Sequence, residues 1–199
     1  MATNNVLTVT GDCISFANHA GDFSPTAAYV LEHGTPLDVE LVLASLAANA
    51  AANSAKFDFA AGGTGWAEEW SIASCLEVAS AAAVVGEVVE LWMAYSTQSG
   101  ATIGNSGGAD GSAGAYAGTS ASTMDNSLGQ LRFIGRHYAT LDDTADSPEV
   151  QICNCGTFRP EARYGQLIVV NKLTGAFHTN DIEMNIVFTP LIPQIQAAV

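Results

Sequence analysis

The sequence predicts an all-β fold, specifically an antiparallel β-sandwich with jelly-roll or Greek-key topology. About eight or nine short runs alternate apolar and polar side chains, which is the period of strands that bury one face. Gly, Pro, Asn and Asp punctuate these runs, and hardly any segment shows a convincing helical pattern. Because 199 residues can form one core between two packed sheets, we expect a single domain over residues 1–199.

The expected central strand is EVVELWMAYS, residues 87–96. Its β-branched and aromatic side chains favour a pleated sheet over a helix. Apolar residues occur at both odd and even positions of this run, so we expect both of its faces to be covered. The longest loop of the chain leaves from its end.

The N-terminal region carries three expectations. Residues 6–16 are interpreted as a hairpin or as a strand kinked at its Gly-Asp pair, and residues 17–36 as a surface loop. Two signals conflict over residues 35–55, because the alanines favour a helix whereas residues 37–43 alternate apolar and acidic side chains. We expect a strand over residues 37–43, followed by a loop or a single helical turn.

Further strands are expected at residues 55–60, 66–80, 128–140, 149–158, 164–173 and 182–191. Pro190 and Pro193 are expected to end the sheet, because proline has no backbone N–H to donate. Glu68 and Glu69 are expected on an outward-facing strand edge, where charge discourages edge-to-edge aggregation.

Residues 100–127 form a low-complexity stretch of Gly, Ala, Ser, Thr and Asn around Tyr116. This composition cannot bury enough apolar surface for a core of its own, so the stretch is either mobile or ordered by something outside the domain. It also lacks the spacing and the basic residue of a phosphate-binding glycine loop. We therefore expect a long Gly/Ser-rich loop, which in the simplest case packs on a neighbouring subunit.

The chain is acidic, with six basic and twenty acidic residues and a formal net charge of −14. Such a field repels phosphate backbones, so we expect no direct binding to nucleic acid. No apolar run approaches the roughly 18 residues that cross a bilayer, and the first residues do not resemble a signal peptide, so we expect no membrane association. Only 13% of residues are charged and 48% are hydrophobic, which leaves room for a buried subunit interface.

The cysteines are Cys13, Cys75, Cys153 and Cys155. Cys153 and Cys155 would share one face of a strand rather than meet in the usual disulfide geometry. Their spacing also lacks the C-x2-C pattern of most zinc sites, so we expect reduced, largely buried thiols and no metal site. The acidic turn with Asp142, Asp143 and Asp146 departs from the EF-hand pattern, which favours a solvated turn over a calcium site.

Candidates for catalysis are His137, His178, Asp181, Glu183 and several serines, whereas His19 and His33 are expected to be solvated side chains of the loop. None belongs to a G-x-S-x-G, H-E-x-x-H or deaminase motif, although two carboxylates from separate strands could still meet as in glycosidases. Trp66, Trp70 and Trp92 are expected in the core or an interface rather than as a sugar-binding platform. The sequence therefore predicts a non-enzymatic protein with no catalytic, cofactor-binding or metal-binding residues and no cofactor.

Three stretches of the sequence carry a family resemblance: VELWMAYS, SLGQLRFIG and VQICNCGTFRPEARYGQLIVVNKLTGAFHTNDIEMNIVFTPLIPQ. Together with the intervening Gly/Ser-rich loop, the chain over about residues 66–195 is similar to small β-rich structural proteins from the virion gene clusters of tailed bacteriophages. The resemblance implies a capsid decoration or cement protein that binds the shell as an oligomer, often a trimer. It carries no site residues with it.

The resemblance also implies the partners and the location. The expected partners are further copies of the chain and the major capsid protein or another virion protein, and the expected location is the virion after synthesis in the host cytoplasm. Two alternatives stay open at this point. One is a tail or head fibre or adaptor component, and the other is a carbohydrate-binding or glycan-acting protein built on the same sandwich.

Overall fold

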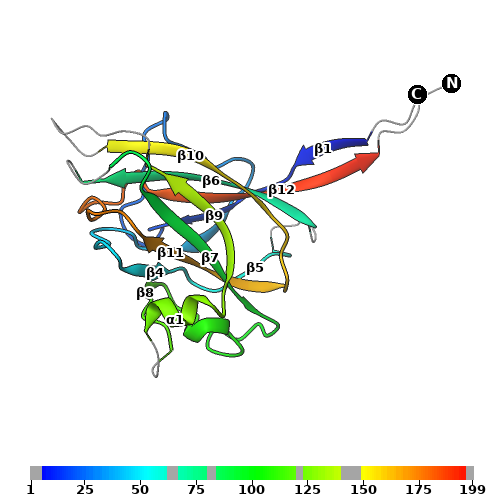
Figure 1. The fold of residues 1–199 in the computed structure, drawn as a ribbon. Coiled ribbons are helices and arrows are strands. Elements are labelled where there is room, and N and C mark those ends of the chain that lie inside the picture. Colours follow the sequence, from blue (N-terminus) through cyan, green and yellow to red (C-terminus); the bar gives the residue numbers. More distant parts are fainter. Residues whose placement is uncertain (1–5, 62–66, 80–83, 120–122, 140–148, 196–199) are drawn as a thin grey trace.

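The computed structural model describes residues 6–61, 67–79, 84–119, 123–139 and 149–195. These residues form two packed β-sheets (Figure 1), which confirms the predicted antiparallel β-sandwich. Within these ranges, helical structure is confined to one short α-helix and one 3-10 turn. No helix in the described part of the chain is long and apolar enough to cross a membrane.

Sheet A has the strand order β10-β6-β12-β2-β3, and β1 pairs with β12 outside this path. Its strands are β1 (Val6–Thr10), β2 (Ile14–Ala17), β3 (Leu37–Glu40), β6 (Glu69–Val78), β10 (Glu149–Phe158) and β12 (Asn185–Ile195). Sheet B has the order β8-β4-β11-β7-β9, with β5 also beside β11. Its strands are β4 (Ala51–Asn53), β5 (Phe57–Asp58), β7 (Val88–Ser96), β8 (Gly114–Ala115), β9 (Arg132–Tyr138) and β11 (Tyr164–Asn171).

The strand order identifies the sandwich as a jelly roll. Without the short or peripheral strands β1, β3, β5 and β8, the sheets have the orders β2-β12-β6-β10 and β4-β11-β7-β9. Counted in chain order, these are the first, eighth, third and sixth strands facing the second, seventh, fourth and fifth, which is the jelly-roll arrangement. The chain therefore crosses between the sheets at almost every connection, and β9 and β10 end up on the same side of the sandwich, each at the edge of its own sheet.

The core between the sheets follows the predicted alternation. Trp70 and Ile72 of β6 and Leu91 of β7 are at most 1% exposed and belong to one buried cluster. Five rings line its centre: Phe16, Phe57, Phe59, Phe158 and Phe188. Four of their edge-to-face contacts have ring centroids 4.7 to 5.0 Å apart, a geometry that adds about 0.5–1.5 kcal/mol per pair beyond area burial.

The N-terminal expectations are resolved in favour of strands. β1 and β2 pair in succession with the same strand, β12, so residues 6–16 form a kinked strand rather than a hairpin. β3 is shorter than expected and ends at Glu40, and turns rather than a helix follow it. Ser45 and Asn49 have φ of 57° and 58°, a left-handed conformation that interrupts any right-handed helix in this alanine-rich stretch. Three of its residues form β4, a strand that the sequence analysis did not predict.

The expectation that Pro190 and Pro193 end the sheet was wrong. β12 continues through both prolines to Ile195 and pairs with β1, from Thr10 opposite Leu191 onward. Beyond Leu191, β1 and β12 form a two-stranded ribbon, so Pro193 removes no ladder hydrogen bond when its nitrogen faces the free edge of β12. At Pro190, β12 pairs with Trp70 of β6 but with neither β1 nor β2, so the strand has one unpaired edge there as well. The strand also starts at Asn185, three residues later than predicted.

The described residues of the Gly/Ser-rich segment are ordered by the chain itself. They contain a 3-10 turn, η1 (Ser106–Gly108), the strand β8 and the helix α1 (Met124–Leu128), which we together call the glycine-rich lobe, described residues 97–119 and 123–131. The sequence analysis expected mobility or an external partner, and it placed the start of a strand at Leu128, where α1 instead ends. The lobe covers the outer face of sheet B, where Tyr116 and Leu128 form a second buried cluster with Ile168 and Val170 of β11.

Lys56 is one of the side chains that fasten this lobe to the sandwich. The ammonium of Lys56 donates hydrogen bonds to the Ser96 hydroxyl at 2.9 Å, to the Gly100 carbonyl at 2.8 Å and to the Ile103 carbonyl at 2.9 Å. Ser96 ends β7, and the two carbonyls lie at the start of the lobe. The low apolar content of the segment is therefore compensated by sheet B and by a half-buried cation, neither of which can be read from the segment alone.

Candidate functional site

The four histidines lie in separate surroundings, so the described residues do not unite them in one site. His19 lies beside Asp38 on β3, and His178 lies beside Glu77 on β6. His33 is held in the loop before β3, and its Nε2 is buried without a hydrogen-bond partner. His137 is buried between β9 and β10.

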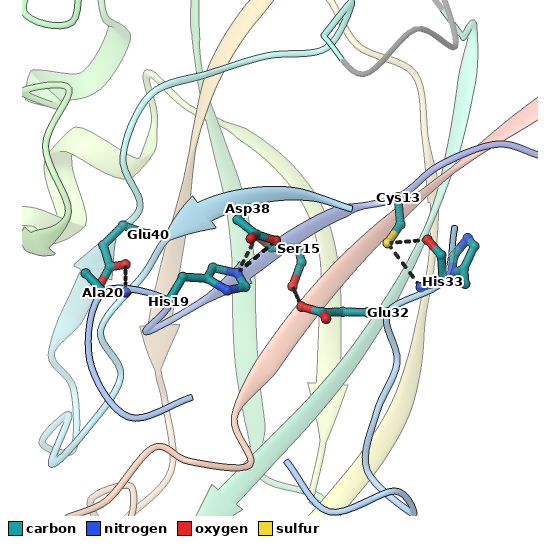
Figure 2. A network of polar contacts seen from close by, with 8 residues as sticks. All are labelled: Cys13, Ser15, His19, Ala20, Glu32, His33, Asp38 and Glu40. Atoms are coloured by element: carbon teal, nitrogen blue, oxygen red, sulfur yellow. Dashed lines mark hydrogen bonds and ion pairs between the residues drawn. The ribbon is translucent and has the colours of Figure 1, made fainter. Parts of the chain in front are cut away.

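A polar network at the edge of sheet A holds the loop of residues 18–36 in place (Figure 2). The Ser15 hydroxyl donates to Glu32 Oε1 at 2.5 Å. Nε2 of His19 lies 3.2 Å from the Ser15 carbonyl oxygen and 3.9 Å from Asp38 Oδ1. The Cys13 thiol donates to the His33 carbonyl at 3.2 Å. These contacts tie the loop to β2 and β3 from both of its ends.

This network does not have the geometry of a nucleophile and its base. Ser15 is fully buried, and its hydroxyl is bonded to a carboxylate while the His19 ring contacts the serine carbonyl instead. Ligand atoms of His19, Glu32 and Asp38 do lie within 4.8 Å of one another, which is close enough to consider a cation. The same contacts are, however, fully explained by their role in fixing the loop.

The predicted carboxylates are committed to the backbone. Asp181 is 2% exposed and accepts hydrogen bonds from the amides of Leu43 at 3.0 Å and Ala44 at 3.2 Å. Glu183 accepts the Thr26 amide at 2.8 Å. Each carboxylate therefore fixes a loop. The Asp181 carboxylate also lies beside that of Asp22 and raises its pKa, but Asp181 is buried and bonded to two backbone amides, so it does not face open space as one of a glycosidase pair would.

Glu77 is buried beside the half-buried ring of His178, next to these loops. Glu77 is 6% exposed, and its Oε1 lies 3.2 Å from Nδ1 of His178. Burial raises the pKa of the Glu77 carboxyl, because desolvation disfavours its charged form more than the histidine favours it.

His137, Cys153 and Cys155 come together between the facing edges of the two sheets. The ligand atoms of these three residues lie within 4.8 Å of one another. Ser74 of β6 lies among them, with its hydroxyl 2.8 Å from His137 Nδ1 and 3.1 Å from Cys155 Sγ. Desolvation lowers the pKa of His137 to about 4, despite a hydrogen bond to Gln151, so the ring is neutral at pH 7.

The thiols are only partly as predicted. All four cysteines are free, and Cys13 and Cys75 are buried as expected, whereas Cys153 and Cys155 are half-buried at the edge strand β10. Burial raises the pKa of Cys155 to about 12, so its thiol is protonated at pH 7.

A shallow hollow opens on the surface between the start of β9 and the end of β10. It has a volume of about 400 Å³ and is lined by Glu69, Arg132, Phe133, Thr157, Arg159 and Glu161, among others. Arg132 and Glu161 form an ion pair, with 3.3 Å between Arg132 Nε and Glu161 Oε1. Glu69, which was expected on a strand edge, begins the central strand β6 and accepts the Thr157 hydroxyl at 3.2 Å. The hollow thus combines an exposed aromatic ring with arginine and carboxylate groups.

Trp70 and Trp92, the tryptophans within the described residues, do not form a flat platform. Trp70 is 1% exposed, and its ring N–H donates to the Ala67 carbonyl, which confirms its prediction as a core residue. Trp92 is half-buried, with its ring edge-to-face on Phe133 at 5.2 Å. Trp66 lies outside the described residues, as do Asp142, Asp143 and Asp146.

The most conspicuous feature of the molecule is an arm that leaves the sandwich. It consists of β1 and the end of β12, residues 191–195, paired over five residues from Val6 opposite Ile195 to Thr10 opposite Leu191. Figure 1 shows this two-stranded ribbon pointing away from the body of the sandwich. Sequence reasoning missed it because it treated the prolines in β12 as the end of the sheet.

Comparison with protein-family models, with curated proteins and with solved structures finds no match to this chain.

Proposed function

We propose that this protein is a non-enzymatic structural component of the virion of a tailed bacteriophage, namely a capsid decoration or cement protein. In this role it binds and stabilises the shell as a homo-oligomer, with trimer as the expected state. The observation that carries the proposal is the arm formed by β1 and the end of β12. An attachment protein needs an element outside its own core, and this arm is such an element.

The arm is suited to attachment because of its backbone. A two-stranded ribbon leaves the outward N–H and C=O groups of both strands without ladder partners, and such edges add readily to a strand of another chain. Isolated two-stranded ribbons are at best marginally stable in water, so a third strand or a covering surface stabilises them. A neighbouring copy or a shell protein supplies both.

The remaining surface fits a component present in many copies. The core of the jelly roll is closely packed and the glycine-rich lobe is fastened to it, so the body can serve as a rigid unit. The net charge of −14 keeps the chain soluble at high concentration, while the low charged fraction, 13%, limits the cost of burying surface between subunits. Jelly rolls occur in viral capsid domains, but also in lectins and enzymes, so the fold alone does not decide the matter.

Removal of the arm tests the proposal. A variant that lacks residues 1–10 loses β1, while all of sheet B and most of sheet A stay intact. We expect the full chain to co-sediment with shells from which the protein has been stripped, and the truncated chain to bind them at least tenfold more weakly. A matched control is Ile103→Ser, a change at a 58% exposed residue of the glycine-rich lobe, which should bind as the full chain does. Equal binding of the truncated chain would remove the basis of the proposal.

Copy number separates decoration from the fibre or adaptor alternative. Quantitative mass spectrometry of purified particles should find the protein in a fixed ratio to the major capsid protein. A handful of copies per particle would instead indicate a fibre or adaptor, and absence from the particle would refute both.

A carbohydrate-binding role is the second candidate, because the hollow beside β9 presents an exposed aromatic ring with polar neighbours. Phe133 is 38% exposed there, beside Arg132 and Arg159. A glycan array that compares the wild type with Phe133→Ala tests this role better than a change at Trp92, which packs against that ring. Binding of a defined glycan that the variant loses would favour this second function.

A further inference from the structure

The buried cluster between β9 and β10 has no part in the function proposed above. We propose that His137, Cys153 and Cys155 form a binding site for a thiophilic divalent cation of the zinc type. The site would join the edge of sheet B to the edge of sheet A. This departs from the sequence-based expectation of no metal site.

The fold, rather than the spacing along the chain, assembles the three donors. Cys153 and Cys155 both lie on the inner side of β10, because the residues that alternate with them, Ile152 and Asn154, are exposed. A β-bulge between Asn154 and Gly156 makes Cys155 the extra residue of the ladder with β6. His137 comes from β9 in the other sheet.

The donors are close to the geometry that zinc requires. Their ligand atoms lie within 4.8 Å of one another, whereas a tetrahedral zinc with bonds of about 2.0–2.3 Å separates its ligands by roughly 3.5–3.8 Å. Rotation of the two cysteine side chains closes the difference of about 1 Å without moving the strands. The Ser74 hydroxyl, already 2.8 Å from the imidazole and 3.1 Å from Cys155 Sγ, is placed to serve as fourth ligand or to hold a water in that position.

The groups around His137 resemble those around a metal site, in which a neighbouring polar group fixes the orientation of a ligand. His137 is 2% exposed and also hydrogen-bonds the buried side chain of Gln151, as metal-bound histidines usually bond a neighbouring polar group that fixes the ring. Two thiols give up their protons to solvent when the ion binds, and two thiolates with a divalent cation and a neutral imidazole leave no net charge. A neutral complex suits a site whose histidine is buried and whose two cysteines are half-buried.

The same cluster is not explained by packing alone. Hydrophobic side chains would fill this space without any polar partner to satisfy, whereas Ser74, Gln151 and His137 are all buried and depend on one another for hydrogen bonds. The other group of three potential ligands in the described ranges, at His19, contains no sulfur and would favour a harder cation.

Cobalt provides the test, because Co²⁺ occupies zinc sites and thiolate ligation gives it a charge-transfer absorption in the near ultraviolet. We expect the reduced, chelator-treated full chain to bind one equivalent of Co²⁺ with this absorption and with the visible bands of tetrahedral cobalt, and Zn²⁺ to abolish both. Cys153→Ser and Cys155→Ser should each weaken binding at least tenfold. Cys13→Ser, a change at a buried thiol outside the cluster, should leave it unchanged.

A second readout protects the test against misfolding of a variant. Stoichiometric Zn²⁺ should raise the midpoint of thermal unfolding of the wild type and of Cys13→Ser, but not that of Cys153→Ser. Cys153 is half-buried on an edge strand, so its replacement disturbs folding least. Absence of the charge-transfer absorption in the wild type would overturn the proposal. Undiminished charge-transfer absorption in the variant that lacks both Cys153 and Cys155 would also overturn it. Visible cobalt bands without the charge-transfer absorption of thiolate ligation would overturn it too, because they would assign the ion to another site.

Discussion

Replacement of Lys56 by methionine tests whether the glycine-rich lobe is held by the sandwich. Methionine keeps most of the side-chain volume but removes the ammonium that donates to Ser96, Gly100 and Ile103. A hydrogen bond to a charged group contributes about 1.5–3 kcal/mol when it is buried. Lys56 is half-buried, and water can replace it at the two carbonyls, so the expected loss is about 2 kcal/mol in total rather than the sum of three full bonds.

This loss should appear as local opening of the lobe. Hydrogen exchange followed by mass spectrometry measures it, because a loss of about 2 kcal/mol accelerates exchange from the opened lobe roughly 30-fold. The amide of Tyr116, which donates to the Ala51 carbonyl on β4, is a suitable reporter. Amides in the β6 and β12 ladder should keep their protection, since they lie in the other sheet.

A second lysine supplies the matched control. Lys172 makes one ion pair with Asp125 of α1 at 3.2 Å, and the partner carboxylate is exposed. Such a pair contributes about 0–1 kcal/mol, so Lys172→Met should change exchange in the lobe by no more than about fivefold. The reasoning is refuted if Lys56→Met leaves the lobe as protected as in the wild type. It is also refuted if the wild-type lobe exchanges as fast as an unfolded peptide, which is the mobile loop that composition alone suggests.

Three further changes probe other parts of the structure. Gly111→Ala should lower the free energy of unfolding in urea by about 1–3 kcal/mol, because Gly111 has a φ of +90° and the new methyl group would overlap the Ala101 carbonyl. As a control, Gly129→Ala should be nearly neutral, because Gly129 has a helical φ. Glu77→Gln should be more stable than the wild type near pH 8, and this difference in unfolding free energy should shrink toward pH 5. The reason is that the pKa of Glu77 is raised in the folded state, so the wild type gains stability as the carboxyl takes up a proton. A difference that grows as the pH falls would contradict this. Phe59→Ala should cost about 3–5 kcal/mol of unfolding free energy, because the ring is fully buried among other rings, and a loss below 1 kcal/mol would contradict the described core.

The sandwich itself could be predicted because its information is local. In β6 and β7, alternation of large apolar side chains identified both strands within two or three residues of their bounds. In the alanine-rich region the expectation of a strand over a helix was confirmed, because the acidic alternation of β3 was the better guide there. The pattern predicts such strands because the alternation of neighbouring residues shows directly which face of the strand is buried.

The glycine-rich lobe shows where local reasoning ends. Its composition is that of a flexible loop, and nothing within the segment reveals that the outer face of sheet B needs a cover. The relevant signal lay elsewhere, in Ile168 and Val170 of β11 and in Ala94 of β7, which are apolar on the face away from the core. A strand that is apolar on both faces requires material on both sides. The central strand was predicted to be covered in this way, but the segment that covers it was not identified.

The arm and the cysteine cluster were not predicted because both arise from pairing between segments that are distant in the sequence. Pro193 ends a strand only if its neighbours require a hydrogen bond from its nitrogen, and that depends on which edge β1 occupies. Likewise, Cys153 and Cys155 have no metal-site spacing by themselves, and a third donor appears only because the jelly roll brings the edge strand of one sheet beside that of the other. Rules based on spacing apply to sites built from one segment, such as zinc fingers. In a fold where almost every connection changes sheets, side chains from β9 and β10 meet across the sandwich, so the search for sites has to follow the strand order instead.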